Sequence, residues 1–193
     1  DGDAAQLDGL SATGLGGKAA MALTIVVADV VTAAEGASIA DATNIAASGV
    51  DFSANGVSDS FGNVTTGTAI HANVGRIDAK DADVNITVTG TQNTVTADHV
   101  TAINALQAAT TGTVTASLDG NAAQLDGLSA SQAGSKATMA LTIVVADAVT
   151  AAQGSTITLA TNVATVDFSA NGISDAFGNV TTGTAIHANV GRI

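Results

Sequence analysis

The densest charge of the chain lies in the stretch DAKDADVN, where Asp78, Asp81 and Asp83 surround Lys80. Carboxylates at such short spacing in a loop can gather around Ca²⁺, which takes about six to eight oxygen ligands. The stretch lacks the glycine and glutamate that an EF-hand loop needs at its sixth and twelfth positions, so a solvated acidic turn stays open as the other interpretation. Calcium at these three aspartates is the cofactor that the sequence suggests.

The remaining reactive residue types give no support for catalysis. His71 and His187 lie in stretches that we predict to be helical, and His99 lies near a predicted helix start. None of the three has a second histidine or a carboxylate at the spacing of a metal site. The chain has no cysteine, no distinct Ser-His-Asp set and no phosphate-binding glycine motif. We therefore predict that these residues form no enzyme active site.

Composition excludes several classes of partner. Five Lys and Arg stand against 17 Asp and Glu, a formal charge of −12 that repels phosphate backbones, so we expect no nucleic-acid partner. Trp and Tyr are absent and Phe occurs four times, which disfavours tight recognition through an aromatic hot spot. Apolar runs such as MALTIVVADVV are much shorter than the roughly 20 residues that span a bilayer, so we expect no membrane insertion.

An internal repeat organises the chain. DGDAAQLDGLSA at Asp1 returns as DGNAAQLDGLSA at Asp119, and FGNVTTGTAIHANVGRI at Phe61 returns unchanged at Phe177. We predict a first repeat unit at 1–118 and a second, truncated unit at 119–193 within one continuous structure. Because neither end reads as the polar cap that stacked repeats require, the sequence predicts end-to-end continuation, by covalent extension or by self-association of subunits.

A finer period lies within each unit. Strand-like alternation recurs about four times in the first unit, roughly every 29 residues, and helical patterns separate the strands. Thr96 is placed to cap one helix, and Thr32 with Glu35 and Thr150 with Gln153 have capping-box spacing. Helices that join strands in this way place the strands in parallel. The pattern predicts a right-handed α/β solenoid with one parallel sheet. The strands are expected at 23–27, 50–54, 84–89, 113–118, 141–145 and 166–170.

One phrase of the repeat has a known counterpart. VATVDFSANGISD and its upstream copy GVDFSANGVSD resemble the leucine-rich-repeat pattern L-x-x-L-x-L-x-x-N-x-I in its bacterial, internalin-like form. The resemblance implies structural roles, with the asparagine bonding backbone groups where the strand gives way to a loop. The key positions are Phe52 and Asn55 in the first copy, and Phe168 and Asn171 in the second.

A broader resemblance concerns the amino-acid composition and the recurring phrases of the chain. Phrases such as INALQAATTGTVTASLDGNAAQL resemble the tandem repeats of very large bacterial cell-surface and secreted proteins, especially cyanobacterial ones. The resemblance implies an extracellular structural or adhesive module that forms a surface array, stalk or filament. The alternative is a leucine-rich-repeat-type module that binds a protein or glycan on its sheet face. The ligand in that case is not specified by the sequence.

Overall fold

The computed structural model describes residues 1–7, 23–42, 45–52, 54–128, 138–159, 163–182, 185–188 and 190. The predicted mixed α/β class with a parallel sheet is confirmed. The helices are α1 (Ala4–Leu7), α2 (Ala33–Ala40), α3 (Phe61–Val64), α4 (Ala72–Asp78), α5 (Ala97–Ala109), α6 (Ala122–Leu125), α7 (Ala151–Leu159) and α8 (Phe177–Val180). The strands are β1 (Leu23–Val26), β2 (Ile45–Asp51), β3 (Val57–Ser60), β4 (Thr65–Thr66), β5 (Ala69–Ile70), β6 (Ile86–Asn93), β7 (Thr113–Gly120), β8 (Thr138–Val145), β9 (Val163–Asp167), β10 (Thr181–Thr182) and β11 (Ala185–Ile186).

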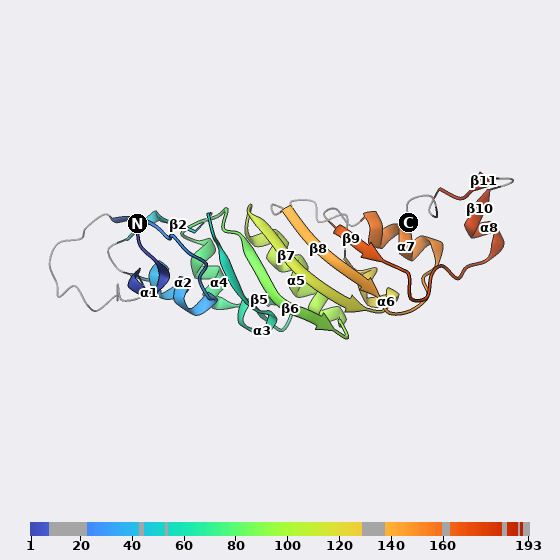
Figure 1. Ribbon diagram of the computed structural model, residues 1–193, viewed down its shortest axis with the longest axis horizontal. Coiled ribbons are helices and arrows are strands. Elements are labelled where there is room, and N and C mark those ends of the chain that lie inside the picture. Colours follow the sequence, from blue (N-terminus) through green and yellow to red (C-terminus); the bar gives the residue numbers. More distant parts are fainter. Residues whose placement is uncertain are drawn as a thin grey trace.

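Parallel pairing dominates an elongated molecule (Figure 1). A five-stranded sheet has the order β3-β6-β7-β8-β9, and β1 and β2 form a second parallel pair. The helices α5 and α7 lie behind the sheet in the view of Figure 1. Two short antiparallel hairpins, β4-β5 and β10-β11, stand outside these sheets. Within the described residues, the parallel strands therefore belong to two sheets rather than to the single one expected.

Alternation along the strands creates a buried face and a solvent face. In β7, Val114, Ala116 and Leu118 are buried, and Thr115 between them is exposed. The buried side chains belong to one hydrophobic cluster that also contains Ile103 of α5. Side chains on a strand point alternately to opposite faces, so the period of two seen in the sequence explains which residues form the core. No described helix is long and apolar enough to cross a bilayer.

The spacing between paired strands is less regular than the expected 29 residues. Val57 pairs with Ile86, which is 29 positions later, whereas Leu141 pairs with Val163, only 22 positions later. The connecting helices vary from the four residues of α6 to the thirteen of α5. Because the connection lies outside the sheet, its length can change without disturbing the pairing of the strands.

The strand expected at 50–54 ends at Asp51, and a turn separates β2 from β3. Gly56 in this turn has φ +67°, a conformation that glycine adopts without steric cost. Phe52 is buried at the start of the turn. Its counterpart Phe168 follows the edge strand β9 and is half-buried. The same phrase therefore packs more deeply in the first copy.

The helical pattern that we expected through His71 is wrong in its first half. Residues 65–70 form the hairpin β4-β5 around Gly67, which has φ +58°. The helix α4 begins only after His71, whose backbone is extended. Val74 and Ile77 of α4 are buried, as their spacing predicts. The helical spacing thus held only where no left-handed glycine interrupted it.

Candidate functional site

Two aspartates join neighbouring strand–helix units by the same bond in both copies. Asp29 Oδ1 accepts the Ala4 N–H at 2.6 Å, and Asp147 Oδ1 accepts the Ala122 N–H at 2.6 Å. Each acceptor lies 25 residues after its donor, in the next unit along the chain. The first N–H groups of a helix have no partner within the helix, so a carboxylate from the following unit completes its hydrogen bonding.

A second pair of aspartates repeats the arrangement at longer helices. Asp59 Oδ2 accepts the Ala33 N–H at 3.1 Å at the start of α2, and Asp175 Oδ2 accepts the Ala151 N–H at 2.9 Å at the start of α7. The sequence separations are 26 and 24 residues. We refer to Asp29, Asp59, Asp147 and Asp175 as the clamp aspartates. Each links a helix N-terminus to the unit that follows it.

Asparagine side chains hold two of the clamp aspartates in place. Asn63 Nδ2 donates to Asp59 Oδ1 at 2.8 Å, and Asn179 Nδ2 donates to Asp175 Oδ1 at 2.7 Å. The pKa of Asp175 is lowered, first by the bond from Asn179 and then by backbone N–H donors. At Asp59, desolvation by burial raises the pKa. The hydrogen bonds that its carboxylate accepts outweigh this and hold the pKa below its usual value. Both carboxylates therefore stay ionised at neutral pH, and the lowered pKa makes each of them a weaker base.

The asparagines of the leucine-rich-repeat-like phrase also bridge units. Asn55 Nδ2 donates to the Ala28 carbonyl at 2.9 Å, and Asn171 Nδ2 donates to the Ala146 carbonyl at 2.7 Å. Both carbonyls lie just beyond the ends of β1 and β8, where strand gives way to loop. Both asparagine side chains are exposed to solvent. These bonds join consecutive units at the strand ends. Here the later residue is the donor, whereas the earlier residue donates to each clamp aspartate.

The structure brings together two members of the candidate calcium site. Asp81 is buried, and its Oδ2 accepts the Phe52 N–H at 2.5 Å. Burial, followed by its hydrogen bond with Asp83, raises the pKa of Asp81 to about 6. Asp78 is the last residue of α4. Among the described residues, which include all three aspartates, no cluster of three or more His, Asp or Glu is arranged to hold a metal ion. Calcium binding here stays a prediction.

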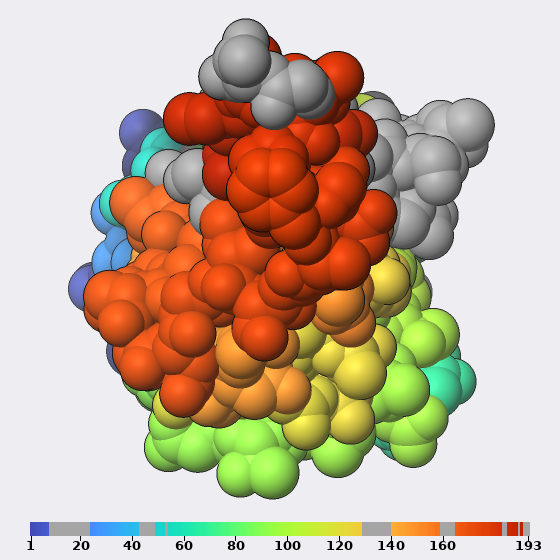
Figure 2. Space-filling model, turned by 90° about the vertical axis from the view of Figure 1, so that its right-hand side faces the viewer, coloured from blue at the N-terminus to red at the C-terminus, as the bar shows by residue number. Residues whose placement is uncertain are grey.

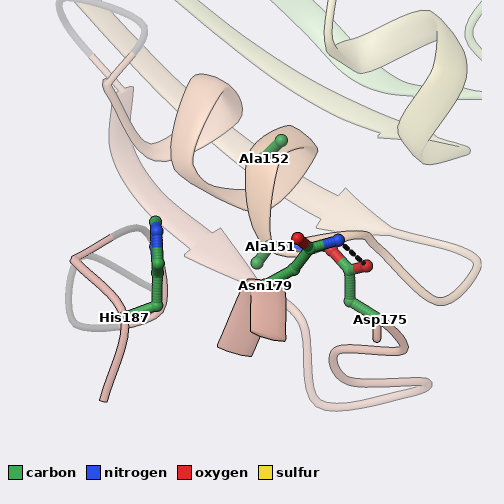
Figure 3. A pocket seen from close by; sticks show the side chains of 5 residues that line it. All are labelled: Ala151, Ala152, Asp175, Asn179 and His187. Carbon is green, nitrogen blue, oxygen red and sulfur yellow. Dashed lines mark hydrogen bonds between the residues drawn. The ribbon is translucent and has the colours of Figure 1, made fainter. Parts of the chain in front are cut away.

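A hollow of about 220 Å³ lies at the start of α7, lined by Ala151, Ala152, Asp175, Asn179 and His187 (Figure 3). Its one carboxylate, Asp175, is occupied by the three hydrogen bonds from Ala151, Ala176 and Asn179. The alanines contribute only methyl groups. The titratable side chains of the lining are those of Asp175 and His187.

Two histidines serve as caps. His71 Nδ1 accepts the Asn73 N–H at 3.2 Å at the start of α4. His99 Nδ1 accepts the Thr96 N–H at 3.3 Å, which makes His99 the reciprocal partner of the cap at α5. The sequence indicated Thr96 as a cap but missed both histidines. For His99 the available signal was its position relative to the helix start, because the third helical residue is where a capping box places its acceptor. His71 is itself the N-cap residue of α4.

Comparison with protein-family models, with curated proteins and with solved structures finds no match. The chemistry of the candidate sites therefore has to be judged from the geometry alone. The clamp aspartates and Asn55 with Asn171, which recur in both copies, bind backbone groups of a neighbouring unit.

Proposed function

We propose that the chain is a structural repeat module, an α/β solenoid of the leucine-rich-repeat-like kind that extends end to end into a surface array, stalk or filament. The supporting observation is the recurrence of unit-to-unit bonds. The clamp aspartates and Asn55 with Asn171 make equivalent contacts in the two copies, at separations of 24 to 27 residues. Side chains that repeat the same unit-to-unit contacts in both copies would hold an extended repeat together.

The solvent face of the sheet fits this proposal better than a binding surface. Thr91, Ser117, Thr142 and Thr165 occupy paired positions on β6, β7, β8 and β9. Threonine is favoured in strands for its shape, and a row of short hydroxyl side chains offers little apolar area to a protein partner. A leucine-rich-repeat-type binding module would place large and varied side chains on this face. That alternative ranks second for this reason.

An extracellular location belongs to the same proposal. The Ala/Thr/Val/Asp-rich texture resembles bacterial surface repeats, and the absence of cysteine is compatible with a surface protein that avoids thiol chemistry. With a formal charge of −12, such an array would repel itself at low ionic strength. Calcium at Asp78, Asp81 and Asp83 would reduce that repulsion. A calorimetric titration with millimolar CaCl₂ tests this part. If the wild-type chain gives no heat of binding, or if Asp83→Asn binds calcium as well as the wild-type chain, calcium at this site is removed from the proposal.

The decisive experiment measures the native material. Denaturing mass spectrometry gives the mass of the native polypeptide, and negative-stain electron microscopy of the same preparation gives its shape. A mass near 18.5 kDa with filaments or sheets indicates subunits that assemble. A much larger mass with rods whose length scales with the number of repeats indicates a covalent tandem array. Compact, isolated particles of either mass, without extended assembly, contradict the proposal.

A further inference from the structure

Seventeen consecutive residues are identical in the two copies, at 61–77 and at 177–193. Up to the end of the hairpin, their described parts make the same local bonds. Thr65 Oγ1 donates to the Phe61 carbonyl at 2.8 Å, and Thr181 Oγ1 donates to the Phe177 carbonyl at 2.9 Å. The hairpins β4-β5 and β10-β11 share the same pairing register. After the hairpin the copies differ, because the Gly75 N–H donates to the His71 carbonyl within α4, whereas the Val190 N–H donates to the His187 carbonyl.

In the first copy the following strand–helix segment covers this hairpin. The strand β6 pairs in parallel with β3, and α5 packs against β4 and β5. The rings of Phe61 and His99 meet edge to face with centroids 4.7 Å apart. Val64 is completely buried as a result. The cover thus consists of one strand and one helix, at residues 84–109.

In the second copy the same side chains face solvent. Phe177 is 77% exposed and Ile186 is 69% exposed, whereas their counterparts Phe61 and Ile70 are packed against the core. Val180 is half-buried. We call the side chains of Phe177, Val180 and Ile186 the uncovered face. Figure 2 looks onto this end of the molecule, where the orange and red residues of the second copy face the viewer.

Two equivalent glycines give an independent observation. Gly56 and Gly172 have nearly the same left-handed backbone, with φ of +67° and +62°. A Cβ on Gly56 would overlap the carbonyl of Asn85, because the next strand passes directly over it. A Cβ on Gly172 would meet nothing within 4 Å. The second copy therefore has open space at the position where the first copy receives a strand.

We propose that the uncovered face is a docking surface for a second copy of the strand–helix segment 84–109, supplied by another repeat. The proposal rests on the proposed function and names the contact by which repeats would continue. The docked strand pairs in parallel with residues 173–176, and Ile173 takes the place that Val57 has opposite Ile86. The Phe177 ring then packs against the imidazole of the incoming His99. Residues 84–109 are chosen because, within the described residues, they already make this contact with the equivalent face of the first copy.

The first experiment uses tryptophan as a unique probe, because the chain contains no Trp or Tyr. Phe177→Trp reports on the uncovered face, and Phe61→Trp reports on the covered counterpart. We expect the indole at position 177 to emit at the long wavelength of an exposed ring. A longer chain is then made in which residues 78–118 follow Ile193, as Asp78 follows Ile77 in the first copy. In this chain we expect the emission of Phe177→Trp to shift to that of Phe61→Trp. An unchanged spectrum in a folded, extended chain overturns the proposal.

The second experiment tests docking without a covalent link. A synthetic peptide of residues 78–118 is titrated into the 193-residue chain by calorimetry, and we expect saturable one-to-one binding. Phe177→Ala should weaken binding at least about tenfold, because a buried aromatic anchor carries a large share of such an interface. A peptide with His99→Ala should also bind more weakly. Val30→Ala is the matched control, since Val30 is 50% exposed on another part of the molecule and should leave binding unchanged.

The outcomes separate this proposal from the proposed function. Binding that Phe177→Ala weakens and Val30→Ala does not supports docking at the uncovered face. Binding that neither variant alters, or that both weaken equally, overturns it. If the native material forms extended arrays while the peptide and the extended chain leave position 177 exposed, the structural function stands and this contact fails. If position 177 becomes covered but the native material is compact, the contact stands and the structural function fails.

Discussion

The segments 61–77 and 177–193 have the same sequence and different surroundings. Their hairpins and the hydrogen bonds from Thr65 and Thr181 agree, so this part of the segment itself determines its local structure. Burial differs, because Val64 is fully buried while Val180 is half-exposed. Burial of a repeat therefore depends on the unit that follows it. Paired substitutions at equivalent positions separate the two contributions, since each position in one copy has its control in the other.

The largest difference is expected at the paired glycines. Gly56→Ala forces a left-handed alanine and a clash with the Asn85 carbonyl, and we expect a loss of about 3 kcal/mol or more. Gly172→Ala keeps only the backbone penalty of about 1 kcal/mol, because its Cβ would face open space. Urea unfolding followed by circular dichroism measures both. Equal losses at the two positions would mean that the covering strand does not approach Gly56 as described.

Valine truncation measures the same difference within the apolar core. Val64 is fully buried, and Val64→Ala should cost about 2 to 3 kcal/mol through lost burial and the cavity that remains. Val180→Ala should cost about 1 kcal/mol or less, because its side chain is already partly hydrated. The ratio of the two losses in thermal or urea unfolding is the quantity to compare. In the chain extended by residues 78–118, the loss for Val180→Ala should rise toward that for Val64→Ala.

Asp81 adds a pH dependence to the first copy. Its pKa is about 6 in the folded chain and near 3.8 when unfolded, so the folded state holds more protons between these values. Stability should therefore rise as pH falls from 7 to 5, by about 1 kcal/mol or less once solvent screening is allowed for. Urea midpoints across this range measure the slope.

The control for this slope is Asp81→Asn, whose amide oxygen can still accept the Phe52 N–H and whose amide can donate to Asp83. It should flatten the stability profile between pH 5 and 7. Persistence of the slope in this variant would assign it to another group. The lowered pKa values of Asp59 and Asp175 affect stability only at lower pH, where those carboxylates become protonated.

The smallest effect should be equal in both copies. Asp29→Ala and Asp147→Ala each remove one carboxylate from a helix N-terminus, and we expect each to cost about 1 kcal/mol. Both aspartates are exposed and make bonds of the same length, so we expect matching losses. Asp98→Ala, which removes an acidic residue of the first turn of α5 rather than a clamp, serves as the control. Losses that differ between Asp29 and Asp147 by more than the error would show that the copies are not equivalent here.

Local signals in the sequence predicted local structure well. Thr32 and Thr96 cap helices as their spacing indicated, since a capping box involves residues only three apart. The parallel arrangement followed from the repeat. The hairpin at 65–70 was missed because Ile70, Val74 and Ile77 have helical spacing, while Gly67 breaks the helix through its φ. The pattern of apolar residues alone does not reveal that conformation.

The unit-to-unit bonds could not be predicted from the same signals. Asp59 and Ala33 are 26 residues apart, and their contact depends on the lengths of every strand and loop between them. Asp59 and Asp175 occupy the same place in the repeated phrase, which was the one available hint of a shared role. The raised pKa of Asp81 was likewise hidden, because it results from burial beside Phe52 in a distant part of the sequence.

The clamp aspartates make the molecule respond differently to a pulling force at its two ends. Every one of them reaches back to a helix that precedes it in the chain. A helix is therefore secured by the unit after it, and peeling a unit away from the carboxyl side releases the start of the helix before it. Tension applied from that side would open units in sequence, one clamp at a time. A load applied from the amino side also breaks the clamp of the unit that it removes, but the helices of the remaining units keep theirs.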